Sequence, residues 1–296
     1  MQILRTPDQR FENLPGYEFG ANYVEIDTLR VHFVDEGPRD GDIFLLLHGE
    51  PSWSYLYRHM IPPLAAAGFR VIAPDLIGFG KSDKPASKRA YSFAGHVAWM
   101  RTFIEQLDLR DINLFCQDWG SLIGLRVAAE NETRFARIAL GNGGLPTGDE
   151  DMPAAFKTWQ KFARYSPWFP IGRIIQKATV SELPDDVVEA YDAPFPAAKY
   201  KAGARVFPSL VPTRPDDPAS EANRVAMQVF ARWQKPFLTT FSNRDPITRG
   251  GERIWQEHVP GARGVEHIRI MNAGHFLQED KGPEIAQVLI EFVAKT

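Results

Sequence analysis

Short apolar runs that end at turn residues alternate with stretches of helical period along most of this chain, and this alternation constrains the fold more than any other feature. The runs that we predict to be buried strands are residues 44–47, 71–73, 112–115, 138–140, 237–241 and 267–271. The helices that we predict cover residues 55–67, 93–107, 119–130, 254–258 and 284–294. This order is typical of βαβ units and predicts an α/β fold with a mostly parallel central sheet flanked by helices.

Two regions depart from this rhythm. Side chains alternate between apolar and polar in residues 23–27 and 31–35, which predicts an antiparallel hairpin at the sheet edge. Residues 145–224 are rich in proline and aromatic residues and contain no clear strand. We therefore expect an α/β core made of residues 1–144 and 225–296, with residues 145–224 inserted as a helical cap over the end of the sheet.

Charge and cysteine content exclude several classes of protein. The 296 residues include 34 Lys and Arg against 37 Asp and Glu, so the net charge of −3 does not suit a nucleic-acid-binding protein. A single cysteine, Cys116, excludes an intramolecular disulfide and a cysteine-rich zinc site. No apolar run approaches the roughly 18 residues of a membrane helix, and residues 1–8 do not resemble a signal peptide. We expect a cytoplasmic protein that is a monomer, with an oligomer left open, and that binds no membrane, metal or cofactor.

Asp118, Asp245 and His275 each stand just after a predicted strand. In a parallel sheet, ligands bind in the crevice outside the carboxyl ends of the strands, so we expect these three side chains to meet there. Asp118 is the centre of Cys116-Gln-Asp-Trp-Gly120, which has the small-x-nucleophile-x-small form of a strained strand-to-helix turn. A carboxylate is already ionised at neutral pH, so it attacks saturated carbon without help from a base. No serine has the Gly-x-Ser-x-Gly context of an esterase.

These motifs resemble those of haloalkane dehalogenases in the α/β-hydrolase superfamily. The order Asp118, Asp245, His275 matches nucleophile, acid and histidine in that superfamily. Residues 48–58, 75–85 and 117–120 are similar to the subfamily that has glutamate after the first His-Gly, and the likeness covers nearly the whole chain. The resemblance implies hydrolysis of haloalkanes to a primary alcohol, halide and a proton, through an ester on Asp118 that His275-activated water hydrolyses.

In such a reaction, negative charge develops on the ester oxygen and on the leaving halide, and both need hydrogen-bond donors. We expect the backbone N–H groups of Glu50 and Trp119 to hold the ester oxyanion. The indole N–H of Trp119 is one expected halide donor, since an indole has no acceptor to repel an anion. The resemblance implies a second tryptophan from the cap, for which Trp159 fits best and Trp168 is the alternative. The residues that we expect to line an apolar substrate pocket are Leu122, Phe156, Phe162, Phe207, Pro208, Val211 and Ile247.

Two other functions share parts of this pattern. An epoxide hydrolase would use the same aspartate nucleophile and activated water, but its alkoxide leaving group needs acidic donors, normally two cap tyrosines. Tyr165, Tyr191 and Tyr200 keep that alternative open, whereas Gln117 and Glu50 favour a halide. A noncatalytic receptor would keep the fold without turnover, and the intact set of nucleophile, acid and histidine argues against it.

Overall fold

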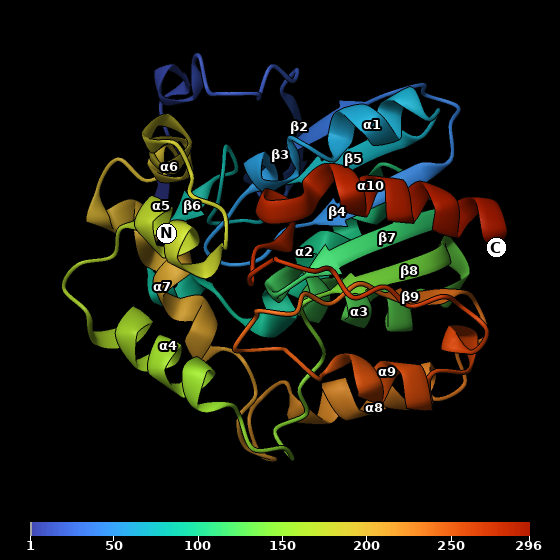
Figure 1. Cartoon of the computed structure of the whole chain (residues 1–296). Helices are drawn as coiled ribbons and strands as arrows, with labels where there is room; N and C mark the ends of the chain where they lie inside the picture. Colours follow the sequence, from blue (N-terminus) through green and yellow to red (C-terminus); the bar gives the residue numbers. More distant parts are fainter. Residues whose placement is uncertain (1) are drawn as a thin grey trace.

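The computed structural model describes residues 2–296, and its main sheet has seven strands in the order β2-β3-β5-β4-β7-β8-β9 (Figure 1). β2 is the strand at one edge of this sheet and β9 is the strand at the other edge. Antiparallel pairing joins β2 to β3 and β3 to β5, and the other neighbours pair in parallel. The bounds are β2 Asn22–Ile26, β3 Leu29–Glu36, β4 Ile43–Leu47, β5 Arg70–Pro74, β7 Ile112–Gln117, β8 Phe135–Gly141 and β9 Phe237–Thr239. The predicted α/β fold with a mostly parallel sheet is confirmed.

The two central strands bring the site segments together. Every residue of β7 is buried, as expected for a strand covered by helices on both faces. In the parallel register of β4 with β7, Leu47 lies opposite Cys116. The segments that follow these strands, which contain Glu50 and Asp118, therefore leave the sheet side by side at the same edge.

Helices cover both faces of the sheet (Figure 1). One face carries α1 (Ile61–Ala66) and α10 (Leu277–Lys295), and the other carries α2 (Phe93–Gln106), α3 (Trp119–Glu130), α8 (Ser220–Phe230) and α9 (Glu252–His258). The helix that we predict over residues 55–67 is instead divided into a 3-10 turn, Ser54–Tyr57, and α1. Pro62 and Pro63 cause the break, because proline lacks the N–H that a continuous helix needs and is accommodated only at a helix start.

The prediction of a strand over residues 267–271 is wrong. Ile270 forms a single isolated bridge there, to Ser242, and Ile268 adds one backbone hydrogen bond to Thr239 O at 3.1 Å. The ring nitrogen Nδ1 of His267 accepts the Thr239 N–H at 3.1 Å, so a side chain replaces a backbone acceptor beside β9. The segment runs along β9 without forming a regular ladder.

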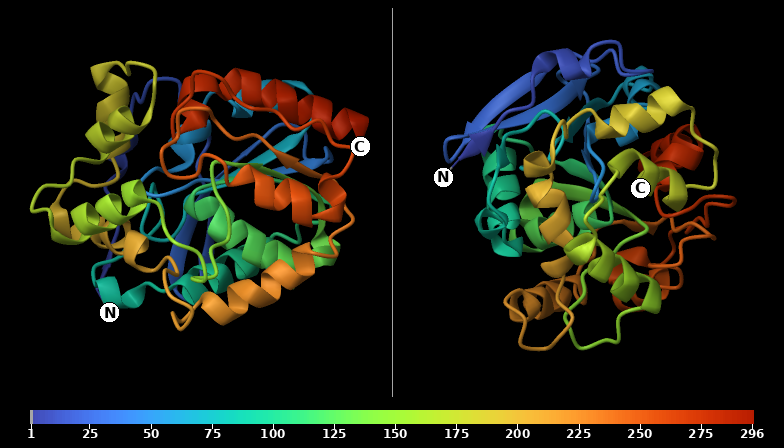
Figure 2. Two further views of the ribbon diagram at one scale, coloured as in Figure 1. Left: turned by 60° about the horizontal axis from the view of Figure 1, so that its bottom comes forward. Right: turned by 90° about the vertical axis from the view of Figure 1, so that its left-hand side faces the viewer.

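Four helices between β8 and α8 gather at one end of the sheet (Figure 2). They are α4 (Ala154–Tyr165), α5 (Ile171–Ala178), α6 (Asp185–Asp192) and α7 (Ala202–Val206). The chain then returns along α8, where Asn223 accepts a hydrogen bond from Arg126 of α3 at 2.9 Å. The cap boundary that we predict at residue 224 therefore falls inside a helix that packs on the core. No helix within residues 2–296 combines the length and the apolar character needed to span a bilayer.

The remaining short elements lie at the edges. β1 (Ile3–Leu4) pairs antiparallel with β6 (Lys84–Pro85) in a separate small sheet. Short 3-10 turns connect the larger elements at Asp8–Phe11, Lys88–Ala90, Glu132–Arg134, Ala198–Lys201, Phe207–Ser209 and Pro260–Ala262.

Candidate active site

Asp118 occupies a strained turn between β7 and α3. Its backbone has φ of 50° and ψ of −127°, in a region that non-glycine residues rarely adopt. The turn is possible because its neighbours are small: a Cβ on Gly120 would lie 1.9 Å from the carbonyl oxygen of Leu47, and one on Gly49 would lie 2.4 Å from Asp118 Cβ. The small residues of the motif thus let the turn press against β4 and raise the carboxylate above the sheet.

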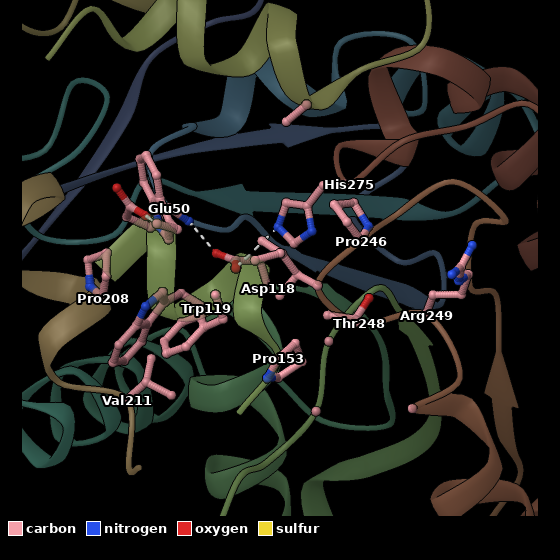
Figure 3. A pocket seen from close by; sticks show the side chains of 18 of the residues that line it. Glu50, Asp118, Trp119, Pro153, Pro208, Val211, Pro246, Thr248, Arg249 and His275 are labelled. Atoms are coloured by element: carbon pink, nitrogen blue, oxygen red, sulfur yellow. Dashed lines mark hydrogen bonds and ion pairs between the residues drawn. The ribbon is translucent and has the colours of Figure 1, made fainter. Parts of the chain in front are cut away.

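The three strand-end residues form one connected hydrogen-bonded network, of which Figure 3 shows the part that joins Glu50, Asp118 and His275. Asp118 Oδ1 accepts the backbone N–H of Glu50 at 2.7 Å, and Asp118 Oδ2 lies 3.3 Å from His275 Nε2. On the other side of the ring, His275 Nδ1 lies 2.9 Å from Asp245 Oδ2. The imidazole is therefore held between two carboxylates. Trp119 is the first residue of α3, where backbone N–H groups lack an intrahelical acceptor.

The charges of Asp118, Asp245 and His275 shift the pKa values of Asp245 and His275. Burial opposes ionisation of Asp245, but the His275 charge and the hydrogen bonds from His275, Thr248 and the Ile247 N–H outweigh it and lower the pKa of Asp245 to about 2. Burial likewise opposes the charge on His275, but Asp245 and Asp118 outweigh it and raise the pKa of His275 to about 10. The structure thus favours an imidazolium while both carboxylates are ionised.

Sequence reasoning missed Asn142, which joins three loops of the site. Its Nδ2 donates to Ser242 Oγ, Gly274 O and His275 O at 2.8, 2.9 and 3.0 Å, and its Oδ1 accepts the Ser242 N–H at 2.8 Å. Its backbone carbonyl also accepts the N–H of Asp118 at 3.0 Å. The only sequence signal was its place directly after β8. Gln117 adds a further contact, since its Nε2 donates to His275 O at 3.2 Å.

A cavity of about 1110 Å³ opens above Asp118 and His275. Apolar side chains from the core and the cap surround these groups, which suits an apolar substrate. Of the residues that we expected around a pocket, those lining the cavity are Leu122, Phe156, Phe162, Pro208, Val211 and Ile247.

Phe207 requires a correction. It is fully buried behind the cavity wall, where its ring packs against Trp119, His96 and Phe79 at centroid distances of 4.4, 4.5 and 4.8 Å. Phe207 does not line the cavity and instead supports the Trp119 ring from behind.

Comparisons with known proteins agree on one family. A model of the alpha/beta hydrolase fold matches residues 42–282. A haloalkane dehalogenase of Psychrobacter cryohalolentis is 57% identical over 298 residues, which cover 99% of this chain and 98% of that protein. A haloalkane dehalogenase of Mycobacterium marinum is 55% identical over 297 residues, covering 99% of this chain and all (100%) of that protein. The chain belongs to the haloalkane dehalogenase family.

A solved structure agrees with this assignment. The haloalkane dehalogenase of Paraglaciecola agarilytica, described as tetrameric, superimposes with a TM-score of 0.90 at 35% identity and covers 97% of each chain. The family that the motifs resembled in the sequence is therefore confirmed.

The two cap tryptophans occupy different environments in this dehalogenase. Trp159 lines the cavity and donates its indole N–H to Glu50 Oε2 at 3.2 Å. Trp168 also contacts the cavity, but 66% of its surface is exposed. Trp119 is only 2% exposed and lies in the cavity wall beside Asp118 (Figure 3). Trp159 is the cap indole that the fold brings to the Glu50 side of the cavity.

The tyrosines needed by an epoxide hydrolase are elsewhere. Tyr165 is 70% exposed. Tyr191 is buried and donates to Glu279 Oε2 at 2.5 Å, and neither it nor Tyr200 lines the cavity. Within residues 2–296, no tyrosine hydroxyl faces the Asp118 cavity, and the dehalogenase family membership also disfavours the epoxide reaction.

The cap is attached directly to the histidine loop. The backbone N–H of His275 donates to the carbonyl of Ala178, the last residue of α5, at 2.7 Å. Asp280 accepts the N–H groups of Val180 and Ser181 from the cap and of Gly274 from the loop, at 2.7 to 3.0 Å. A change in cap position therefore acts on the loop that holds the histidine.

Proposed function

We propose that this chain hydrolyses carbon–halogen bonds of haloalkanes to a primary alcohol, a halide ion and a proton. The observation that carries the proposal is the Asp118 carboxylate, which lies between the Glu50 N–H and His275 at the floor of an apolar cavity. The full-length similarity to named haloalkane dehalogenases supports the same reaction.

The first step is a displacement by Asp118. Oδ1 accepts the Glu50 N–H at 2.7 Å and Oδ2 has only the longer 3.3 Å contact with His275, so we assign the attack on the halogen-bearing carbon to Oδ2. A carbon–oxygen bond forms as the carbon–halogen bond breaks, and the halide leaves with the bonding electron pair. The product is an alkyl ester on Asp118. No proton moves in this step, which suits a carboxylate nucleophile.

His275 becomes a base only after that step. Esterification removes one of the two negative charges that raise the pKa of His275, which lowers that pKa and makes it easier for the imidazolium to release its proton to solvent. The neutral ring then takes a proton from water, which attacks the ester carbonyl carbon. Asp245 orients the ring through Nδ1 and stabilises its charged form.

The attacked ester develops an oxyanion on the atom that was Oδ1. The backbone N–H groups of Glu50 and Trp119 are the donors that we assign to this charge. In other enzymes the loss of one such donor costs about 2.7–4 kcal/mol of transition-state stabilisation. As the tetrahedral intermediate breaks down, the bond between its central carbon and the alkyl-bearing oxygen breaks, and that oxygen takes the proton from the His275 imidazolium to leave as the alcohol. The carboxylic acid left on Asp118 then gives its proton back to His275, which restores the carboxylate and the imidazolium.

We assign halide binding to the indole N–H groups of Trp119 and Trp159. Both rings line the cavity, whereas the ring of Trp168 is mostly exposed. Trp159→Phe is expected to weaken bromide binding, measured by tryptophan fluorescence, more than Trp168→Phe does. Equal effects of the two substitutions would remove Trp159 from this role.

The covalent ester is tested by blocking its hydrolysis. Wild-type protein is expected to release bromide catalytically from a dibromoalkane. His275→Phe is expected to release bromide only in amounts equal to the enzyme, and to carry an alkyl mass increment on the peptide that contains Asp118. His258→Phe is the matched control, because His258 is exposed and its side chain bonds, within residues 2–296, only to Ile254 O of its own helix. Continued turnover by His275→Phe would contradict the mechanism.

Three features inferred from the sequence stay predictions: the cap between residues 145 and 224, the cytoplasmic location and the monomeric state. The Paraglaciecola agarilytica relative is described as a tetramer. Sedimentation of the purified chain measures its own state of association.

A further inference from the structure

The side chain of Glu50 is an unusual component of the cavity wall. It is only 4% exposed, and its Oε2 accepts the Trp159 indole N–H at 3.2 Å. Its Oε1 is buried and has no hydrogen-bond partner within residues 2–296. No lysine or arginine of that range pairs with the carboxylate. Burying an ionised carboxylate with a single donor is costly, so this environment favours the neutral acid.

Of the two charged groups that face Glu50, Asp118 acts in the same direction as burial and His275 opposes it. Burial and the negative charge of Asp118 raise the pKa of Glu50 well above its usual range, although the Trp159 hydrogen bond and the positive charge of His275 partly oppose them. Asp118 and His275 are the ionisable groups that act on Glu50, and the cap contributes the Trp159 indole.

The Trp159 indole has one N–H, so it cannot donate a full hydrogen bond to the Glu50 carboxylate and to a halide ion at the same time. The N–H that bonds to Glu50 is the one that we assign to the halide. A hydrogen bond to an ionised acceptor is roughly twice as strong as one to a neutral acceptor. An ionised Glu50 therefore competes with the halide for this N–H and also repels it by charge.

We propose that Glu50 is a proton-controlled element of the halide site. As the neutral acid it leaves the Trp159 N–H available to a halide ion, whereas as a carboxylate it retains that N–H and expels the ion. This inference rests on the proposed function, since it concerns the halide product of that reaction.

Halide binding and proton binding are then linked. A ligand that binds only the protonated form of a group loses affinity tenfold for each pH unit above the pKa of that group, and by reciprocity its binding draws in a proton. Bromide affinity is therefore expected to fall with this slope as pH rises through the pKa of Glu50. Loss of the His275 charge at higher pH also weakens anion binding, so a Glu50 variant must separate the two effects.

The test is a bromide titration of tryptophan fluorescence across the neutral and alkaline range. Glu50→Gln preserves the backbone N–H and replaces the neutral acid by an amide that cannot ionise. It is expected to lose the Glu50-dependent fall in affinity while keeping the fall due to His275. Glu150→Gln is the matched control, because Glu150 also lines the cavity but is exposed and bonds to Thr147. Its profile is expected to match the wild type.

Proton uptake gives a second measurement. On mixing with bromide in weak buffer, wild-type protein is expected to take up more protons than Glu50→Gln, as followed with a pH indicator. If Glu50→Gln does not fold, Trp159→Phe replaces it, because loss of the donor to the carboxylate is expected to move the step to higher pH. Coincident pH profiles of wild type and variant would overturn the inference. Absence of bromide release from a dibromoalkane by the wild type would instead overturn the proposed function.

Discussion

Asn142→Ala is expected to destabilise the protein and slow the reaction together. The substitution leaves the buried N–H of Ser242 without its 2.8 Å acceptor, and an unsatisfied buried group costs about 1–3 kcal/mol. The loss of the donated bonds is milder, because Gly274 O still accepts from Ser242 Oγ at 2.7 Å and His275 O from Gln117 at 3.2 Å. These lost bonds add about 1 kcal/mol. The expected total is about 2–4 kcal/mol of unfolding free energy.

The assay combines urea unfolding, followed by tryptophan fluorescence, with bromide release from a dibromoalkane. Release is expected to fall about 10- to 100-fold, because the His275 loop loses a fixed attachment and small displacements of catalytic groups are costly. Asn22→Ala is the control, since Asn22 lies on the edge strand β2 and its side-chain bonds are 3.4 Å long. If the unfolding free energies of the two variants agree within about 0.5 kcal/mol, the role assigned to Asn142 is refuted.

Three further predictions concern stability, measured by urea unfolding. Gly120→Ala is expected to cost about 1–3 kcal/mol or more, because the added Cβ would lie 1.9 Å from Leu47 O. Glu279→Gln is expected to cost about 3–5 kcal/mol, because it leaves the Arg58 guanidinium, whose side chain is 3% exposed, without its buried partner. The pKa of Asp245 is lowered from its usual 3.8 to about 2 in the fold, so its ionised form stabilises the folded protein above pH 3.8. This contribution is lost as the pH falls from 3.8 towards 2. Over that interval the wild type is therefore expected to lose more unfolding free energy than Asp245→Asn.

Matched variants separate these effects from general ones. Gly20→Ala adds a methyl group with no atom within 4 Å and is expected to be neutral, so equal costs at both glycines would contradict the close approach at Gly120. Glu284→Gln breaks only an exposed 3.8 Å contact with Lys281, and a cost as large as that of Glu279→Gln would contradict the burial argument. Parallel acid profiles of wild type and Asp245→Asn would contradict the third prediction.

The order of strands and helices was predictable because it rests on local signals. Continuous apolar runs gave the buried parallel strands, and helical periodicity gave α2 and α3 almost to the residue. The failure at residues 267–271 arose where a histidine ring replaced a backbone acceptor. An apolar pattern does not reveal a substitution of that kind.

Some residues of the candidate site were also predictable from local sequence signals, and others were not. Asp118, Asp245 and His275 were found because each follows a strand, and parallel strands end at one edge of a sheet. Phe207 was misplaced because apolar character predicts burial but not which side of a wall the ring occupies. Asn142 was missed because its importance lies in contacts with residues about 100 and 130 positions away.

By itself, the sequence determined the sheet with its helices, the aspartate at the strained turn and the family, since these depend on residue type, spacing and similarity along the chain. Only the tertiary structure decided that one asparagine ties three loops together, that Phe207 supports Trp119, and that the Trp159 indole meets a buried Glu50 carboxyl. The reason is physical: hydrogen bonds and charge interactions act over a few ångströms, and the packing of distant segments alone sets which groups come that close.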